Sequence, residues 1–351
     1  MVMKKDARAI KDAIEDEGEL SDAEIALIKK KQEGGEEPTL TDLPGIGPAV
    51  AAKLDSAGIY DLMGLAVMSP AVLADVAGVG PGVARKAIQA ARNMLNLGFQ
   101  DGMEYAKKRD SVSFITTGSK ELNKLLGGRG IESRSITEAF GAFGSGKTQL
   151  GLTLAVNVQL PLDQGGANGK SVFVDTEGTF RPARIKQIAE GLGLNPEKVL
   201  KNIFVARAFN SDHQILLLDK VAEMIKNGEP IKLVIIDSLT AHFRAEYSGR
   251  GQLADRQQKL NKYLHNLMKV AEERNLAVYV TNQVMANPAM MFGDPTTAIG
   301  GNIVGHASTY RMYLRRGKKD SRVAKLIDSP NLPDGECVFF VSDKGVMDGD
   351  I

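Results

Sequence analysis

The chain contains no tryptophan and a single cysteine, Cys337, among its 351 residues. One cysteine excludes an internal disulfide and a cysteine-based zinc site. Long apolar runs are also missing: none approaches the roughly 18 residues that a membrane-spanning helix needs. Met1 to Lys11 lacks the apolar core of a signal peptide. We therefore expect a cytoplasmic protein that has no membrane partner.

Neither sign of charge is in excess. The formal net charge is +1, and charged residues make up 25% and hydrophobic residues 43% of the chain, as in ordinary globular proteins. The net charge therefore gives no indication of a nucleic-acid partner, and any binding of nucleic acid must depend on local clusters of basic residues or backbone N–H groups. The length favours two or three domains.

The most informative stretch runs from Gly141 to Thr148 and matches the phosphate-binding loop pattern G-x-x-x-x-G-K-[ST]. It lies between an expected strand, Ser135 to Phe140, and an expected helix, Lys147 to Val158. Glycines permit a tight backbone path whose N–H groups point at phosphate oxygens. Lys147 would reach the β- and γ-phosphates, and the Thr148 hydroxyl would ligate Mg²⁺. We therefore expect ATP and Mg²⁺ as cofactors. The predicted ATP-binding residues of this stretch are Gly141, Ala142, Phe143, Gly144, Ser145, Gly146, Lys147, Thr148 and Gln149.

Two acidic residues end later strands. Asp237 closes the apolar run from Lys232, as a Walker B segment requires, and would hold Mg²⁺. Glu177 follows the strand Ser171 to Thr176, where a carboxylate is placed to orient the attacking water. The alternative for Glu177 is that it caps the following helix.

From about Ser111 to the end, β-type runs alternate with helical ones, which is typical of a mostly parallel sheet flanked by helices. Residues 111–351 are therefore predicted to form an α/β ATPase core whose last three β segments extend the sheet at one edge. The expected strands are Ser135 to Phe140, Ser171 to Thr176, Ile203 to Ala208, Lys232 to Asp237, Ala277 to Asn282, Ser308 to Arg316, Arg322 to Ser329 and Glu336 to Ser342.

Residues 1–37 form a charged arm in which Asp22 to Lys31 has the pattern of a short helix. Residues 38–97 contain an internal repeat: Leu43 to Pro48 recurs as Val76 to Pro81, each copy being followed by an Ala-rich helix. Gly-hydrophobe-Gly at the start of a helix offers free backbone N–H groups to a DNA phosphate. The repeat resembles a tandem helix-hairpin-helix motif in a small all-α N-terminal domain. A helical module for protein docking is the alternative.

Residues 98–110 link this domain to the core. Phe99 is notable there, because a large apolar side chain in a linker has no core of its own. We expect it to insert into a neighbouring subunit.

The chain from about Leu40 onward resembles the archaeal recombinases of the RecA-like strand-exchange family. The resemblance is carried, in order, by Gly141 to Thr148, Val174 to Pro182, Ala206 to Ser211, Asp237 to Thr240, Glu246 to Gly251, Arg256 to Leu260, Thr281 to Gln283 and Ala298 to Gly301. It implies a RecA-like fold for the P-loop ATPase core.

The resemblance also implies roles for single residues at the nucleotide. Arg184 matches the arginine that stacks on adenine, and Gln283 matches the residue that senses the γ-phosphate, which makes it catalytic together with Lys147 and Glu177. His306 matches a second sensor position, for which a bland polar surface role is the alternative.

Two stretches resemble the family's DNA-binding loops. The first, about Glu246 to Arg256, carries Arg250 and Arg256. The second, about Met285 to Asn302, is rich in Gly, Pro and Met and nearly free of charge. A loop meant only to grip phosphate would be basic, so its apolar side chains would separate stacked bases instead. Its predicted DNA-binding residues are Phe292, Gly300 and Gly301.

The resemblance further implies assembly. Phe99 with Gly102 resembles the Phe-x-x-Ala polymerisation motif, with glycine in place of alanine, and Asp328 to Asp334 resembles a segment that caps a neighbour's ATP. Such head-to-tail contacts produce a homo-oligomeric helical filament or a ring. In Leu126 to Ile131, Arg129 stands as an insertion in a glycine turn, and we expect no catalytic effect from it.

Together these features predict an ATP-dependent DNA recombinase. It would form filaments on single-stranded DNA, pair it with homologous duplex DNA and hydrolyse ATP in a DNA-dependent way, at the nucleoid of a prokaryote. A hexameric helicase-like motor and a non-catalytic recombination mediator are the alternatives.

Overall fold

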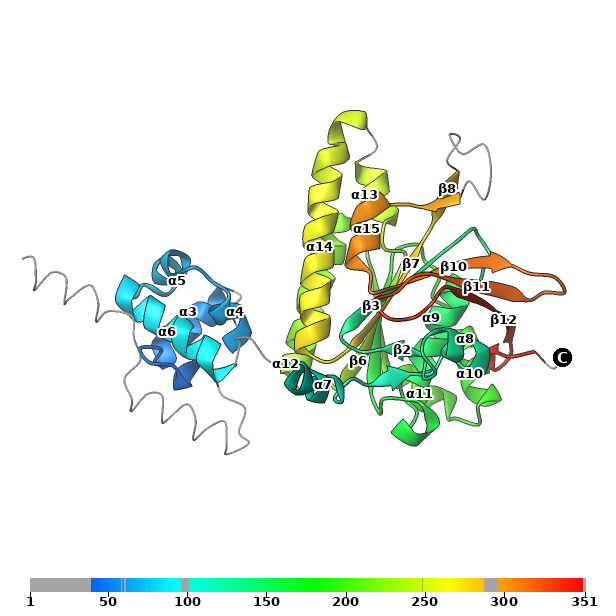
Figure 1. The fold of residues 1–351 in the computed structure, drawn as a ribbon, viewed down its shortest axis with the longest axis horizontal. Helices are drawn as coiled ribbons and strands as arrows, with labels where there is room; N and C mark the ends of the chain where they lie inside the picture. Colours follow the sequence, from blue (N-terminus) through cyan, green and yellow to red (C-terminus); the bar gives the residue numbers. More distant parts are fainter. Residues whose placement is uncertain are drawn as a thin grey trace, which may run out of the picture. The chain divides into compact units, whose positions relative to one another are not determined.

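The computed structural model describes residues 39–57, 59, 61–95, 101–247, 249–286 and 296–349. It divides into two compact units, Met1–Lys107 and Lys108–Ile351 (Figure 1). The predicted charged arm and its helix, Phe99, and Phe292 lie outside the described residues.

The first unit is helical, as the repeat predicts. Its described elements are η1 (Leu40–Asp42), α3 (Pro48–Ser56), α4 (Leu62–Ala66), α5 (Pro70–Ala77) and α6 (Pro81–Met94), followed by α7 (Gly102–Arg109) in the stretch predicted as linker. The two copies of the repeat join η1 to α3 and α5 to α6, and in both a proline begins the second helix, where its missing N–H is tolerated.

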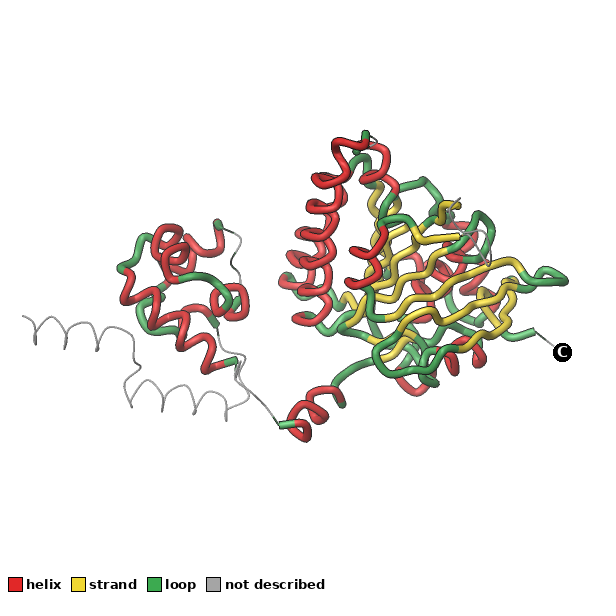
Figure 2. The backbone as a smooth tube through the Cα atoms, turned by 45° about the horizontal axis from the view of Figure 1, so that its top comes forward, coloured by secondary structure: helices red, strands yellow, loops and turns green. Residues whose placement is uncertain are grey.

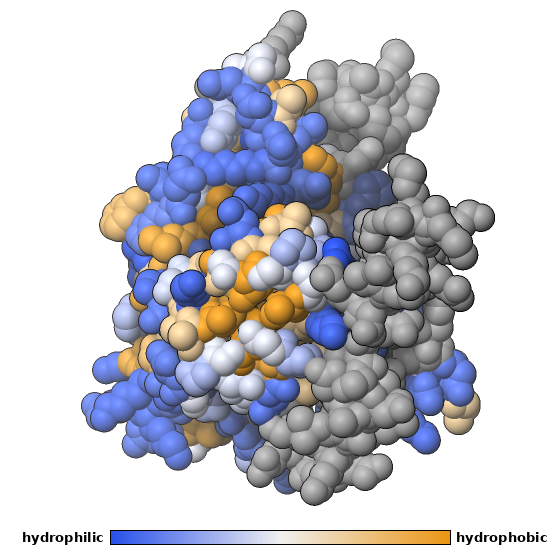
Figure 3. Space-filling view, turned by 90° about the vertical axis from the view of Figure 1, so that its left-hand side faces the viewer, coloured by the Kyte–Doolittle hydropathy of each residue, from blue (hydrophilic) through white to orange (hydrophobic). Residues whose placement is uncertain are grey.

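A small apolar core holds these helices together. One face of α6 buries alanines around Ile88, and such small side chains let helix backbones approach closely. Val67 and Val72 stay exposed, and the face drawn in Figure 3 has an apolar patch among hydrophilic side chains. Exposed apolar area is a feature of docking surfaces.

The second unit is an α/β core. Its helices are α8 (Lys120–Leu125), α9 (Lys147–Asn157), η2 (Leu162–Gln164), α10 (Pro182–Gly191), α11 (Pro196–Lys201), α12 (Ser211–Lys226), α13 (Ala241–Glu246), η3 (Arg250–Gln252), α14 (Leu253–Glu273) and α15 (Gly301–Ala307). Its strands are β1 (Phe114–Ile115), β2 (Ile131–Glu132), β3 (Ser135–Phe140), β4 (Lys170–Asp175), β5 (Ile203–Arg207), β6 (Ile231–Asp237), β7 (Ala277–Asn282), β8 (Val284–Ala286), β9 (Thr296–Ala298), β10 (Tyr310–Arg316), β11 (Arg322–Asp328), β12 (Gly335–Ser342) and β13 (Gly345–Met347).

Nine of these strands form one sheet, in the order β13-β12-β11-β10-β3-β7-β6-β4-β5, which Figure 2 shows as one continuous layer. From β10 to β5 every pairing is parallel, while β11, β12 and β13 add antiparallel at one edge. The prediction of a mostly parallel sheet that the last β segments extend is confirmed. The bounds predicted for β3 and β7 are those observed.

Apolar layers cover both faces of the sheet, with α9 and α10 on one face and α12 and α14 on the other (Figure 1). Successive residues of a strand point to opposite faces. Accordingly Tyr279 of β7 packs in the α9 layer, and Val278 and Val280 pack in the α14 layer. Among the described residues, no helix combines the length and the apolar character needed to cross a membrane.

Arg129 lies in a turn where Gly127, Gly128 and Gly130 all have positive φ. Its guanidinium lies 3.9 Å from the centre of the Phe114 ring, a cation–π contact. The side chain of Arg129 therefore packs from this turn against Phe114 of β1.

Candidate nucleotide-binding site

The phosphate-binding loop connects the end of β3 to the start of α9. A Cβ on Gly141 would lie 2.0 Å from the carbonyl oxygen of Leu314 in β10, so a side chain does not fit there. Gly146, the N-cap of α9, has φ 101°, in the left-handed region that favours glycine. The two fixed glycines of the pattern are therefore required for different reasons. Gly141 is required by the close approach of β10, and Gly146 is required by its left-handed backbone conformation.

A cleft of about 620 Å³ opens at this loop, at the carboxyl ends of β3, β4, β6 and β7. Such an edge of a parallel sheet is where ligands bind in open α/β folds. The lining residues are Gly141, Ala142, Phe143, Gly144, Gly146, Lys147, Thr148, Gln149, Glu177, Thr179, Asp237, Ser238, Thr281, Gln283, Val284, Arg322 and Val341. Ser145 is buried behind them. The cleft thus brings most of the predicted nucleotide and metal residues together.

Lys147 is held in place by the loop itself. Its Nζ donates to the carbonyl oxygens of Gly141, at 2.8 Å, and Ala142, at 3.0 Å. Burial lowers the pKa of Lys147, and the nearby carboxylates of Asp237 and Glu177 act in the opposite direction. The result is an ammonium fixed among backbone dipoles at the floor of the cleft.

Asp237, at the end of β6, is buried and accepts hydrogen bonds from threonine hydroxyls on three other segments. Thr148 donates to Oδ2 at 2.8 Å and Thr179 donates to the same oxygen at 2.9 Å, while Thr281 donates to Oδ1. No cluster of three or more His, Cys, Asp and Glu side chains suited to a metal occurs in the described part of the chain. Mg²⁺ does not need one, because it is commonly held by one or two carboxylates, waters and substrate phosphates. The oxygen donors around Asp237 therefore fit Mg²⁺.

Glu177 and Gln283 meet across the cleft. The Nε2 of Gln283 donates to Oε1 of Glu177 at 2.7 Å, although the two residues come from different strand ends. Gln283 directly follows β7, and the next residue begins β8. The sensor and the acid that the resemblance implies are therefore hydrogen-bonded to each other.

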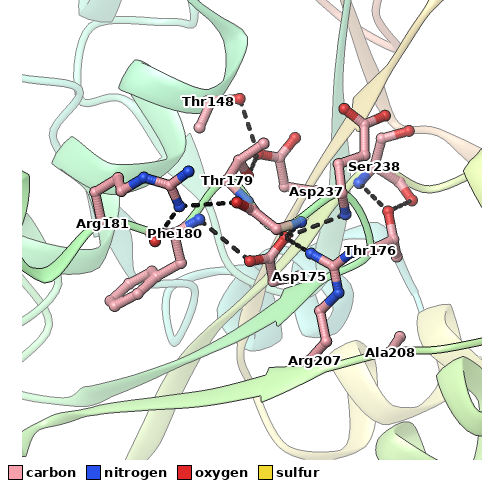
Figure 4. Close-up of polar contacts among 12 residues, drawn as sticks. Thr148, Asp175, Thr176, Thr179, Phe180, Arg181, Arg207, Ala208, Asp237 and Ser238 are labelled. Atoms are coloured by element: carbon pink, nitrogen blue, oxygen red, sulfur yellow. Dashed lines mark hydrogen bonds and ion pairs between the residues drawn. The ribbon is translucent and has the colours of Figure 1, made fainter.

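The turn that carries Glu177 is organised by Asp175, a residue without a predicted role. Its buried carboxylate accepts the backbone N–H groups of Glu177, Gly178 and Thr179 at Oδ1, and that of Phe180 at Oδ2 (Figure 4). An aspartate followed by backbone donors two to five residues later is the pattern of an Asx-type turn. The Asp-x-x-Gly spacing in the sequence is the signal that could have identified it.

Arg184 lies on α10 and is locked by neighbours: its Nε donates to Oε1 of Gln149 at 2.8 Å, and its guanidinium also donates to the carbonyl oxygen of Ser342. Neither Arg184 nor His306 is among the residues that line the cleft. His306 is exposed on α15.

The residues predicted to bind DNA lie elsewhere on the core. A second cavity, of about 890 Å³, is lined by Arg256 in the first turn of α14 and by Gly300 and Gly301 at the start of α15. Further cationic lining residues are Arg244, Arg311, Arg315 and Lys325. The second predicted loop begins in β8, includes β9, which pairs antiparallel with β8, and ends in the first turn of α15. The backbone of Arg250 lies in η3, and Gly102 begins α7.

A glycine loop that joins a strand to a helix, facing an acid-tipped strand of the same parallel sheet, defines a P-loop protein with a RecA-like core. The family model described as Rad51 matches residues 108–349, and the model described as SAM-like helix-hairpin-helix tandem matches residues 37–93. The curated DNA repair and recombination protein RadA of Aeropyrum pernix is 50% identical over 309 residues, which are 88% of this chain and 96% of that protein. The chain belongs to the Rad51 family, and the RecA-like fold with its helix-hairpin-helix domain is confirmed.

Proposed function

We propose that this protein is an ATP-dependent DNA recombinase that assembles on single-stranded DNA and exchanges strands with a homologous duplex. Membership of the Rad51 family supports this function, as does the similarity to a protein named for DNA repair and recombination. The observation that carries the proposal is the position of Gln283. It donates a hydrogen bond to Glu177, the proposed catalytic acid, and directly precedes β8, the first strand of the pair from which a predicted DNA-binding loop extends.

At the nucleotide, Lys147 and the loop amides would bind the phosphates, and Glu177 would orient the attacking water. Thr148 and Asp237 would hold Mg²⁺, which neutralises phosphate charge when bound. Arg184 would stack on adenine, and the hydrogen bonds to Gln149 and Ser342 hold its guanidinium in one orientation. The site would then release ADP and phosphate.

For DNA, the cavity bordered by Arg256, Gly300 and Gly301 supplies cationic side chains suited to phosphates. Arg250 would add a further contact from the first loop. The second loop, with Phe292, would separate bases by apolar insertion. The tandem helix-hairpin-helix domain would add contacts to duplex backbone through its hairpin amides.

Assembly would be head to tail. β5 is an edge strand of the sheet and exposes Val205, while Phe209 and Leu216 beside it are also exposed apolar residues. An unpaired edge beside apolar side chains is a template for an added strand. The linker segment around Phe99 and Gly102 of the next subunit is the proposed occupant, with Asp328 to Asp334 and His306 completing a neighbour's ATP site.

A strand-exchange assay with and without ATP tests the function directly. The wild type should convert homologous single-stranded and duplex DNA into exchanged products only with ATP. Products without homology or ring-shaped unwinding intermediates would favour the helicase-like motor, and DNA binding without exchange would favour the mediator.

Lys147→Ala tests the nucleotide site itself. Loss of the ammonium should abolish ATP binding or turnover, because phosphate charge then lacks its cation. Lys220→Ala, on the exposed side of α12, is the matched control and should behave as wild type. Normal hydrolysis by the Lys147 variant would refute the assignment of the cleft.

A further inference from the structure

Thr281 and Asn282 at the end of β7, and Gln283 directly after it, have their partners alternately on the two sides of the sheet. Thr281 donates to Asp237 in the nucleotide cleft, and Gln283 donates to Glu177 in the same cleft. Asn282 between them bonds to a different group of residues. This is what the two-residue period of a strand requires.

Asn282 is completely buried, and its amide is fully used. Its Nδ2 donates to Oε1 of Glu138 at 2.9 Å and to the carbonyl oxygen of Ile299 at 2.6 Å. Its Oδ1 accepts from the hydroxyl of Thr240 at 2.8 Å. Only one amide orientation serves all three partners, because Thr240 must donate while Glu138 and Ile299 can only accept.

Two of these partners lie next to or within the predicted DNA-binding loops. Thr240 is the N-cap residue of α13, the helix that leads into the first loop. Ile299 follows β9 and precedes Gly300, so it lies where the second loop returns to the core. One side chain is therefore hydrogen-bonded both to the residue that caps the helix before the first loop and to a residue of the second loop.

The third partner extends the network to the basic cavity. Oε2 of the fully buried Glu138 accepts from Nε of Arg311 at 2.7 Å, and Arg311 lines that cavity with Arg256. On the nucleotide side, the backbone N–H of Ile299 donates to the carbonyl of Gln283 at 3.0 Å. A displacement of Gln283 therefore acts on Ile299 through the backbone and on Asn282 through the peptide bond that joins them.

We propose that Asn282 is a positioning residue that couples the nucleotide cleft to both DNA-binding loops, so that the two loops respond together to the bound nucleotide. The inference rests on the proposed function, since it assigns a coupling element to ATP-dependent DNA binding. A satisfied, buried polar network suits this role because its members cannot move singly without leaving a donor or acceptor unpaired. Coupling then requires two discrete arrangements rather than a flexible joint.

The first test uses the hydroxyl that ties Asn282 to the first loop. Thr240→Ala removes the donor, and Thr240→Ser keeps the hydroxyl while losing the same methyl group. The measurement is the dissociation constant of fluorescein-labelled oligo-dT with saturating ATP or ADP, and the readout is the constant with ADP divided by the constant with ATP. Thr240→Ala should reduce this ratio by about tenfold, a typical coupling between sites. Thr240→Ser should retain it, and nucleotide affinity should change less than about twofold in both, because neither variant alters the cleft.

The second test separates coupling from stability. Asn282→Asp places two carboxylates together and should lower the melting temperature. In Asn282→Asp with Glu138→Gln, the new amide donates to the new carboxylate, which restores the pair in reverse and recovers much of the melting temperature. The carbonyl of Ile299 still lacks its donor, so the oligo-dT constant with ADP divided by that with ATP should stay reduced by about tenfold.

The outcomes are distinguishable. If the wild type binds oligo-dT equally with ATP and ADP, the proposed function fails. If the wild type discriminates and Thr240→Ala and the double variant discriminate equally well, the coupling role of Asn282 is overturned. A ratio that recovers together with the melting temperature in the double variant would overturn it as well. Should the single Asn282 variant not fold, the Thr240 pair decides alone.

Discussion

Replacement of Asp175 by alanine should remove the hydrogen bonds that hold the turn carrying Glu177 at the end of β4. The carboxylate accepts backbone N–H groups of Glu177 at 3.2 Å, Gly178 at 2.6 Å, Thr179 at 3.0 Å and Phe180 at 3.2 Å. Without it, the backbone of the turn loses this acceptor, and the Glu177 carboxylate keeps only the hydrogen bond from Gln283 among the contacts described above. The expected result is a loss of ATP turnover that exceeds the loss of ATP binding.

The magnitude follows from the hydrogen bonds. A net contribution of about 1.5 kcal/mol is the lower value for a bond to a charged group. Because Glu177 is exposed, the released N–H groups can bind water, and we count only the two shorter bonds, which gives about 3 kcal/mol. At about 2–4 °C per kcal/mol for a domain of this size, the melting temperature should fall by about 6–12 °C. The same free energy lost from the transition state lowers turnover by about 10²-fold.

Two variants serve as controls in an assay of phosphate release with single-stranded DNA. Asp175→Asn keeps the oxygen that accepts three of the four N–H groups, so turnover should fall by about fivefold, or about 1 kcal/mol. Arg207→Gln removes a half-exposed partner 3.6 Å from Asp175, and such pairs contribute less than about 1 kcal/mol. A folded Asp175→Ala protein with wild-type turnover would refute the reasoning.

Three further predictions concern other parts of the chain. Phe99→Ala should lower the mass of the DNA-free protein in light scattering, with Met103→Ala as an exposed apolar control; unchanged oligomers would remove the docking role. Arg250→Ala should weaken DNA binding and leave nucleotide binding intact, and unaltered DNA affinity would contradict the first-loop assignment. Burial raises the pKa of the Cys337 thiol to about 12, with Glu121, Asp348 and Glu336 adding to the rise. Native protein at pH 8 should therefore react with Ellman's reagent about 10³-fold more slowly than unfolded protein, whose thiol has the ordinary pKa of about 9. Because the unfolded thiol ionises first, this group also lowers stability as the pH rises above about 9, and rapid labelling of native protein would contradict the burial.

Much of the core could be predicted because its signals are local. β7 is recognisable as a largely apolar run, since strands of a parallel sheet are buried on both faces, and β3 is recognisable from its place directly before the glycine loop. The loop from Gly141 to Thr148 was recognisable because close approach to Leu314 and a left-handed backbone leave glycine as the residue that fits. Asp237 was predictable because an acid at the end of such a strand faces the loop by topology.

The rest depends on neighbours that local patterns do not specify. Strand order brings Thr281 of β7 beside Asp237 of β6, and no spacing in the sequence encodes that pairing. The motif around Asp175 points to Glu177 as its catalytic acid. The contacts of Asp175 itself are to backbone N–H groups, which no pattern of side chains specifies. β13, a short strand at the sheet edge, likewise has too few residues for a periodic signal.

The polar run Thr281-Asn282-Gln283 contains a signal for a second polar network, which depends on the direction of the Asn282 side chain. The resemblance assigns a role to Gln283 alone. A strand with a two-residue period, however, must direct Asn282 to the face opposite Thr281 and Gln283, and that face is the apolar α14 layer. An amide that enters an apolar layer requires partners for each of its polar atoms, which predicts a buried polar network on the side away from the nucleotide. The contacts to Glu138, Ile299 and Thr240 are that network. The end of β7 therefore links the two faces of the sheet, because its polar residues alternate between partners on one face and partners on the other.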